Sequence, residues 1–171
     1  MKMKKNNNGF SLVELVIVVA ILVIIGGFAL TGVAILSGKP VDECAKKIQV
    51  ALEGNRNTTM GKLSASISFY QDDNGDIYME EVIDGAPPYI KQIGESSVDV
   101  IYCDMAGNAY ILPVFPNKLT MTFDRASGSL KPQSDGSYIV KFVVSRGSSG
   151  ERGYRELSVS LDKLTGRVSV E

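Results

Sequence analysis

The sequence predicts an α+β protein in which a long N-terminal helix packs on an antiparallel β-sheet. Three observations support this fold class. The chain is apolar from Phe10 to Leu36, with Glu14 as the only ionisable residue of that run. Apolar residues then recur at helical spacing from Val41 to Leu52, and after Gly61 the spacing changes to the period of two that is typical of strands.

These changes of pattern divide the 171 residues into four segments. A chain of this length is enough for one ordinary domain and an anchor. We expect a polar leader at residues 1–9, a transmembrane helix at residues 10–38, an amphipathic helix at residues 39–61 and an extracytoplasmic, β-rich globular domain at residues 62–171.

The N-terminus combines a basic leader with an apolar run, which is the general pattern of export signals. A secretory signal peptide has an apolar core of about 7–15 residues, and the run from Phe10 to Leu36 is roughly twice as long. A membrane anchor fits better, because the run spans roughly 40 Å as a helix against a hydrocarbon core of about 30 Å. The lysines of the leader would hold the N-terminus in the cytoplasm, with the body outside.

Glu14 is not explained by an anchor alone. A carboxylate so close to the start of a membrane-spanning helix costs several kcal/mol unless it is paired, protonated or near the interface. Such groups are usually functional, although hydration at the headgroup level is an equally good interpretation of the position by itself.

The string GFSLVEL, from Gly9 to Leu15, resembles the prepilin processing motif of type IV pilins and type II secretion pseudopilins. In that family a membrane peptidase cuts after the glycine and N-methylates the new first residue, here Phe10. The family's glutamate stands at the position of Glu14 and neutralises the N-terminal amine of a neighbouring subunit. The resemblance therefore implies that Gly9 and Phe10 act in processing and that Glu14 acts in filament assembly through the helix at residues 10–38.

The same resemblance implies the partners and the location of the chain. The partners are a prepilin peptidase, other pilin or pseudopilin subunits, an inner-membrane assembly platform and, before assembly, the lipid bilayer. The precursor would be a single-pass protein of the cell membrane with its C-terminal domain outside. The mature subunit would be part of a cell-surface or periplasmic filament.

Two features favour a minor pilin or a pseudopilin. Many major pilins have a proline in the second half of the apolar helix, whereas the first proline here is Pro40. In addition, the strand end Thr122–Asp124, a glycine-rich hairpin and the string Leu164–Val168 are similar to H-type or FimT-like minor pseudopilins. A major pilin or a competence pilus subunit is the alternative within the family. Outside the family, the alternative is a bitopic membrane protein whose outer domain binds a ligand or a partner.

The helical pattern continues beyond the apolar run. Pro40 predicts a kink or a restart, because proline is tolerated in the first turn of a helix but not in its interior. Gly61 is a good helix stop. Between them an apolar stripe predicts a helix face packed on the globular domain, formed by Val41, Cys44, Ala45, Ile48 and Leu52.

Strand patterns begin after Gly61. The alternation from Leu63 to Tyr70 predicts a strand with one buried face, Asp72–Gly75 is a hairpin-turn signal, and Asp76–Val82 forms the returning strand. Tyr89–Gly94 is compatible with a short helical turn. Further strands of an antiparallel meander are expected at Val98–Cys103, Ala109–Phe115, Leu119–Phe123, Tyr138–Val144, Leu157–Leu161 and Arg167–Val170.

The carboxylates of Asp72, Asp73 and Asp76 suggest a calcium loop. The EF-hand pattern requires a glycine after the third ligand and a glutamate at the twelfth place. Ile77 and Ile83 stand at those places. We therefore expect a turn and no metal site.

The two cysteines, Cys44 and Cys103, are too few for a disulfide framework. A single bridge between them is permitted outside the cytoplasm. Two buried free thiols are equally natural, because Cys44 lies on the apolar face of the predicted helix and Cys103 at the end of a predicted strand.

Composition argues against other classes of function. The net charge is −1, so no basic surface for nucleic acid is expected. The chain contains no histidine, the commonest general base, and shows no phosphate-binding glycine loop and no CxxC motif. We expect a structural protein without enzymatic activity and without a cofactor.

Overall fold

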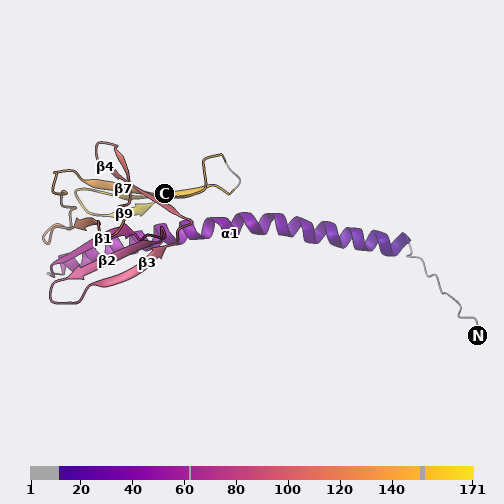
Figure 1. Ribbon diagram of the computed structural model, residues 1–171, viewed down its shortest axis with the longest axis horizontal. Helices are drawn as coiled ribbons and strands as arrows, with labels where there is room; N and C mark the ends of the chain where they lie inside the picture. The colour runs from indigo at the N-terminus through magenta and orange to yellow at the C-terminus, as the bar shows by residue number, and fades with distance from the viewer. Residues whose placement is uncertain (1–11, 62, 151–152) are drawn as a thin grey trace, which may run out of the picture. The chain divides into compact units, whose positions relative to one another are not determined.

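The computed structural model describes residues 12–171 except residue 62 and residues 151–152, and it leaves the side chains of residues 24–37 undescribed. The chain divides into two compact units, residues 1–36 and residues 37–171. The described elements, shown in Figure 1, are the helix α1 (Leu12–Met60) and the strands β1 (Ala65–Gln71), β2 (Ile77–Ile83), β3 (Tyr89–Gly94), β4 (Asp99–Asp104), β5 (Ala109–Ile111), β6 (Leu119–Thr122), β7 (Ile139–Arg146), β8 (Arg155–Leu161) and β9 (Val168–Val170). The predicted α+β class is confirmed.

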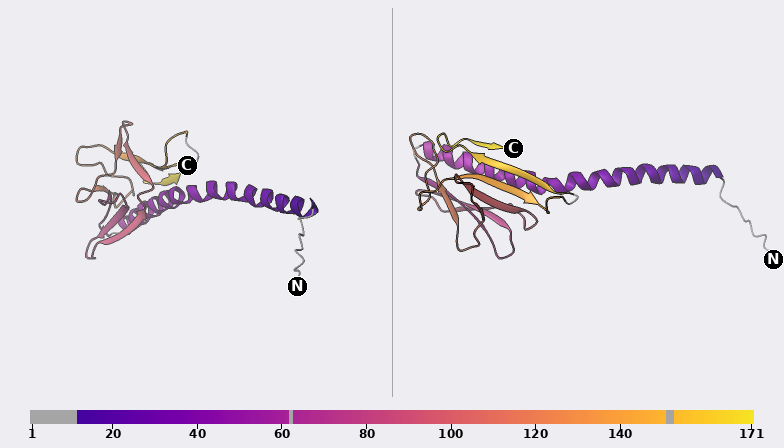
Figure 2. Two further views of the ribbon diagram at one scale, coloured as in Figure 1. Left: turned by 45° about the vertical axis from the view of Figure 1, so that its right-hand side comes forward. Right: turned by 90° about the horizontal axis from the view of Figure 1, so that it is seen from above.

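The strands form two antiparallel sheets, where the sequence predicted one. The first sheet has the order β3-β2-β1-β6, and the second has the order β5-β4-β7-β8-β9. The prediction of a simple meander, in which each strand pairs with the next, is therefore wrong, because β6 pairs with β1 and β7 pairs with β4. Figure 2 shows the strands of both sheets in two further views.

One of the changes of sheet, from β5 to β6, occurs where a longer strand was expected at Ala109–Phe115. Pro113 has no N–H to donate to a strand ladder, and β5 ends at Ile111. The Pro113 carbonyl instead accepts the Gln71 N–H, and the Phe115 N–H donates to the Gln71 carbonyl. These bonds carry the chain from the second sheet to the end of β1 in the first, next to β6.

The helix α1 runs through Pro40 without the restart that the sequence allowed. Pro40 cannot donate to the carbonyl of residue 36, so the helix lacks one bond at this point. The C-terminal end agrees with the prediction, because α1 ends at Met60 and the Gly61 N–H donates to the Asn57 carbonyl at 2.9 Å. The predicted stripe is confirmed, since all five of its residues are fully buried: Val41, Cys44, Ala45, Ile48 and Leu52.

One hydrophobic core joins this stripe to both sheets. Ile67 and Phe69 of β1 and Phe142 and Val144 of β7 all contribute fully buried side chains. The rings of Phe69 and Phe142 meet edge to face, with centroids 5.3 Å apart, and so connect the first sheet to the second. The helix stripe and the two sheets therefore stabilise one another through shared burial.

Strand β1 is buried on both faces, where the sequence predicted one. Its inward side chains are buried as expected, but Ser68 and Tyr70 on the other face are buried too. The Phe115 ring lies 5.6 Å from the Tyr70 ring, and the Lys118 ammonium lies 5.3 Å from its centroid. The segment before β6 thus covers this end of β1. Leu63 lies before the strand and is exposed.

The helical turn considered for Tyr89–Gly94 is wrong, because this segment is strand β3. It pairs with β2 along most of its length, with Gln92 opposite Tyr78 and Ile90 opposite Glu80. Pairing with β2 outweighs the weak preference of this segment for a helical turn. The remaining predicted strands agree with the structure to within about two residues at each end, except at Ala109–Phe115.

The backbone of Gly94 fits tightly against the core, so a methyl group there should destabilise the domain. A Cβ at Gly94 would lie 2.9 Å from the Ile77 Cδ1 atom and 3.0 Å from the Cys44 Sγ atom. We expect Gly94→Ala to lower the free energy of unfolding by about 1–3 kcal/mol, as overpacking does. Gly54→Ala is the matched control, because a Cβ at Gly54 meets nothing within 4 Å and alanine favours a helix by about 1 kcal/mol. Urea unfolding of the two variants measures the difference, and equal stability of Gly94→Ala and the parent chain would refute the packing argument.

Candidate functional site

The residues predicted to act in processing and assembly lie at the N-terminal end of the chain. Gly9 and Phe10 fall outside the described residues. Glu14 lies in the first turn of α1 as described, and its side chain is exposed. A negative charge is favoured at the N-terminal end of a helix by the helix dipole. In the isolated chain, the Glu14 carboxylate is therefore open to a partner outside it.

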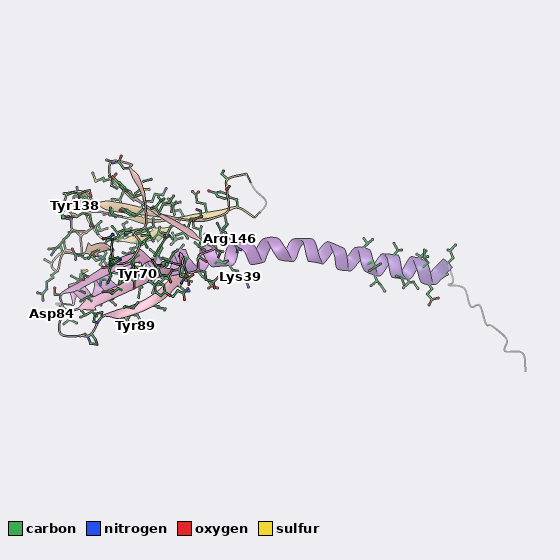
Figure 3. All side chains as sticks on the ribbon, in the orientation of Figure 1. Lys39, Tyr70, Asp84, Tyr89, Tyr138 and Arg146 are labelled. Atoms are coloured by element: carbon green, nitrogen blue, oxygen red, sulfur yellow. The ribbon has the colours of Figure 1, made fainter. Side chains whose placement is uncertain are left out.

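The helix around Glu14 is apolar on every side. Its ten large apolar side chains are 47–79% exposed: Leu12, Val13, Leu15, Val16, Ile17, Val18, Val19, Ile21, Leu22 and Val23. A helix that is hydrophobic all round is normally buried in a large core or in a membrane. Figure 3 shows these side chains projecting around the start of the helix. The segment Leu12–Val23 thus has a large apolar surface whose exposure to water is unfavourable.

Among the residues that the structure describes, no helix meets the length and hydropathy of a membrane span. The predicted transmembrane segment at residues 10–38 includes residues 10–11 and the side chains of residues 24–37, which lie outside the description.

The two cysteines are free thiols in the structure. Cys44 is fully buried in the core beside Gly94, and burial raises the pKa of its thiol to about 12. Cys103 is half-buried in β4, opposite Ala109 of β5 and Lys141 of β7. Both thiols are thus free, but only Cys44 is buried, whereas the sequence left open two buried free thiols or a bridge.

Two of the three carboxylates considered for calcium, those of Asp72 and Asp76, accept backbone hydrogen bonds at the turn between β1 and β2. Asp72 accepts the N–H groups of Asn74 at 3.0 Å and Asp76 at 2.8 Å. Asp76 in turn accepts the Ser96 N–H at 2.9 Å. The bonds to Asp72 fix the hairpin, as Asx turns do, and the bond to Asp76 joins it to the β3–β4 connection.

Two similar turns in the C-terminal half are held by aspartate side chains. Asp124 accepts the N–H and hydroxyl groups of Ser127, and Asp162 accepts the same two groups of Thr165. In each turn a glycine with positive φ follows, Gly128 at 70° and Gly166 at 63°, a conformation that glycine adopts without strain. Both turns share the sequence pattern D-x-x-[ST]-G, at Asp124–Gly128 and at Asp162–Gly166.

Arg56 connects both turns to the end of α1. Its Nε atom donates to the Gly128 carbonyl at 3.1 Å and to the Thr165 carbonyl at 2.9 Å. The helix, the β6–β7 connection and the β8–β9 connection are thereby joined at one side chain. Sequence reasoning missed Arg56, because its acceptors are backbone carbonyls far away along the chain, and no local pattern indicates them.

Residues 4–30 match the family model described as the prokaryotic N-terminal methylation motif. The matched range includes Gly9, Phe10 and Glu14, and it supports the placement of the chain with type IV pilins and pseudopilins. The motif implies processing by a prepilin peptidase and assembly with other pilin subunits, which is the role of a structural protein. No curated protein and no solved structure matches the chain significantly.

Because of the two aspartate turns, the stability of the domain depends on pH in the acidic range. Backbone N–H bonds from Ser127 and Thr165 lower the pKa values of Asp124 and Asp162 below their ordinary value of 3.8. The charged forms therefore stabilise the fold above the unfolded-state pKa, and this contribution is lost as the pH falls through about 4 toward the folded-state pKa values.

We expect the melting temperature to fall as the pH drops below about 4, and to fall less steeply in the double variant Asp124→Asn/Asp162→Asn. Thermal unfolding between pH 2.5 and pH 7 measures both slopes. Asp73→Asn, at an exposed position of the β1–β2 turn, is the matched control for removal of a carboxylate. An unchanged slope in the double variant would contradict the role of these turns.

Proposed function

We propose that this chain is a structural subunit of a type IV pilus-like or type II secretion-like filament, and specifically a minor pilin or a pseudopilin. The observation that carries the proposal is the N-terminal methylation motif at residues 4–30, which coincides with an exposed apolar helix. The motif alone indicates processing, and the helix supplies the surface through which a processed subunit associates. A prepilin peptidase cuts after Gly9 and methylates Phe10.

Glu14 acts in assembly under this proposal. Cleavage leaves a positively charged amine on Phe10, and a filament of packed apolar helices is a medium of low dielectric constant. An unpaired charge is costly in such a medium, whereas a carboxylate close to an amine is strongly attracted to it. Glu14 of one subunit neutralises the amine of a neighbour and so sets the axial register between their helices.

Before assembly the same helix resides in the bilayer. Residues 10–38 form the membrane anchor of the precursor, and the domain beyond residue 38 lies outside the cytoplasm. An inner-membrane platform then transfers the subunit from the bilayer to a cell-surface or periplasmic filament. The exposed apolar side chains of Leu12–Val23 exchange lipid for the helices of other subunits, so their surface remains covered throughout.

Two features support a minor pilin or a pseudopilin. The first proline of the chain is Pro40, beyond the apolar run, so that run lacks the helix-loosening proline of many major pilins. The strings Thr122–Asp124 and Leu164–Val168, which resemble H-type or FimT-like pseudopilins, lie at the two aspartate turns that Arg56 joins to the helix. They therefore occupy positions that connect the helix to the C-terminal half of the domain.

Analysis of the mature N-terminus tests the proposal. The chain is expressed in a host that contains a prepilin peptidase, extracted from its membranes, and analysed by intact mass and N-terminal sequencing. We expect a mature chain that begins with methylated Phe10, and we expect a Gly9→Val variant to retain the leader. A parent chain that keeps Met1 in the presence of active peptidase would instead indicate a bitopic membrane protein.

A further inference from the structure

An open groove lies between α1 and the outer strand of the first sheet. Its volume is about 310 Å³. The groove is lined by Glu43, Lys46, Lys47, Val50 and Ala51 of α1, Met79 of β2, and Lys91 and Ile93 of β3. We call it the lysine groove. The helix contributes one continuous stripe to it, because positions three and four apart in a helix share a face.

The groove borders an open strand edge. Strand β3 stands at the end of its sheet order, with β2 on one side and no further strand beside it among the described residues. Tyr89 is 55% exposed and Ile90 is 54% exposed, and Figure 3 shows Tyr89 on this outer strand. An edge strand with exposed large side chains offers unpaired backbone groups on which another strand can pair.

The chemistry of the groove selects the kind of strand that fits. Met79 and Ile93 form a buried apolar floor, and Val50 at the rim is 59% exposed. Around this floor stand three lysines and a single carboxylate, that of Glu43. A strand with apolar and acidic side chains gains both burial and charge pairing here, whereas a basic strand is repelled.

A single lysine on an edge strand commonly blocks pairing with other chains. If Lys91 were the only lysine here, blocking of strand pairing would be enough to explain it. Lys46 and Lys47, however, come from the helix and converge with Lys91 on the same apolar floor. Convergence of charges from two elements around an apolar surface is typical of a recognition site in which pockets and charges supplement strand addition.

We propose that the edge of β3 and the lysine groove bind an extended acidic segment of a partner protein, which adds to the first sheet as a further strand. The segment pairs its backbone with β3. Its groove-facing side chains place carboxylates near Lys46, Lys47 and Lys91 and apolar groups over Met79 and Ile93. This site is separate from the N-terminal helix segment and does not depend on the proposed filament role.

The test uses the full chain in detergent micelles and a defined probe. The probe is a fluorescein-labelled, capped octapeptide of the sequence Val-Val-Glu-Glu-Val-Val-Glu-Glu, which places both valine and glutamate on each face of a strand. The matched peptide has lysine in place of each glutamate. Fluorescence anisotropy measures the affinity, and hydrogen exchange locates the binding. We expect the acidic peptide to bind at least tenfold more tightly than the basic one, more weakly as salt rises, and to protect amides within Tyr89–Gly94.

Charge variants decide whether the groove is responsible. We expect Lys91→Glu and Lys46→Glu each to weaken binding of the acidic peptide at least tenfold, and Lys91→Gln to weaken it less. Lys131→Glu, an exposed lysine outside the groove, is the matched control and should bind as the parent chain does. Circular dichroism verifies that each variant is folded, and the milder Lys91→Gln keeps the test valid if a charge reversal unfolds the domain.

Three results would overturn the proposal. The first is equal binding of the acidic and basic peptides, or no binding of either. The second is equal loss of affinity in Lys131→Glu and Lys91→Glu. The third is protection of the Tyr89–Gly94 amides when the chain self-associates, with no change on addition of the acidic peptide. That result would identify a second copy of the chain as the occupant of the groove.

Discussion

A helix that is apolar on every side cannot remain exposed to water at low cost, and the rest of this protein depends on that constraint. The described N-terminal stretch of α1, Leu12–Val23, presents ten large apolar side chains that are about half exposed or more. Each such side chain gains roughly 1.5–3 kcal/mol when it is fully buried. Under the proposed function, first the bilayer and then the helices of other subunits supply that burial. The N-terminal methylation motif at residues 4–30 covers the same stretch.

Beyond Pro40, the same helix packs against the globular domain. There the apolar residues narrow to one stripe, and that stripe is fully buried against two sheets. Two of its contacts with the rest of the domain are the packing of Cys44 against Gly94 of β3 and the bonds of Arg56 to both aspartate turns. The C-terminal half of α1 thus positions the first sheet through its middle turns and the C-terminal connections through its last turn. The outward stripe that remains, from Glu43 to Val50, is left to form the lysine groove.

Much of the fold could be predicted from the sequence, because the governing interactions are local. The stripe Val41–Leu52 follows from the 3.6-residue period, and most strands follow from alternation and turn residues. The exchange between sheets could not be predicted, since it depends on bonds between Gln71 and the segment around Pro113. The burial of Tyr70 was missed for the same reason, because its cover comes from Phe115 and Lys118. Tyr89–Gly94 has no strong local preference, and its strand structure comes from pairing with β2.

The functional residues also differ in whether they could be predicted from the sequence. Roles for Gly9, Phe10 and Glu14 could be predicted because a peptidase reads a short processing motif as a contiguous string, which needs no folded context. The lysine groove and the Arg56 contacts combine residues that lie far apart in the chain, so only the folded structure brings them together.

Under the proposed function, Glu14 neutralises the N-terminal amine of a neighbouring subunit inside a filament of apolar helices. Glu14→Gln tests it most directly, because glutamine keeps the size of the side chain and removes its charge. The measurement is the amount of the chain in sheared filaments relative to the membrane, with Glu53→Gln of the same helix as the matched control. The account predicts that Glu14→Gln is cleaved and methylated normally but is at least tenfold depleted from filaments, whereas Glu53→Gln is incorporated as the parent chain is. Normal incorporation of Glu14→Gln would contradict the account.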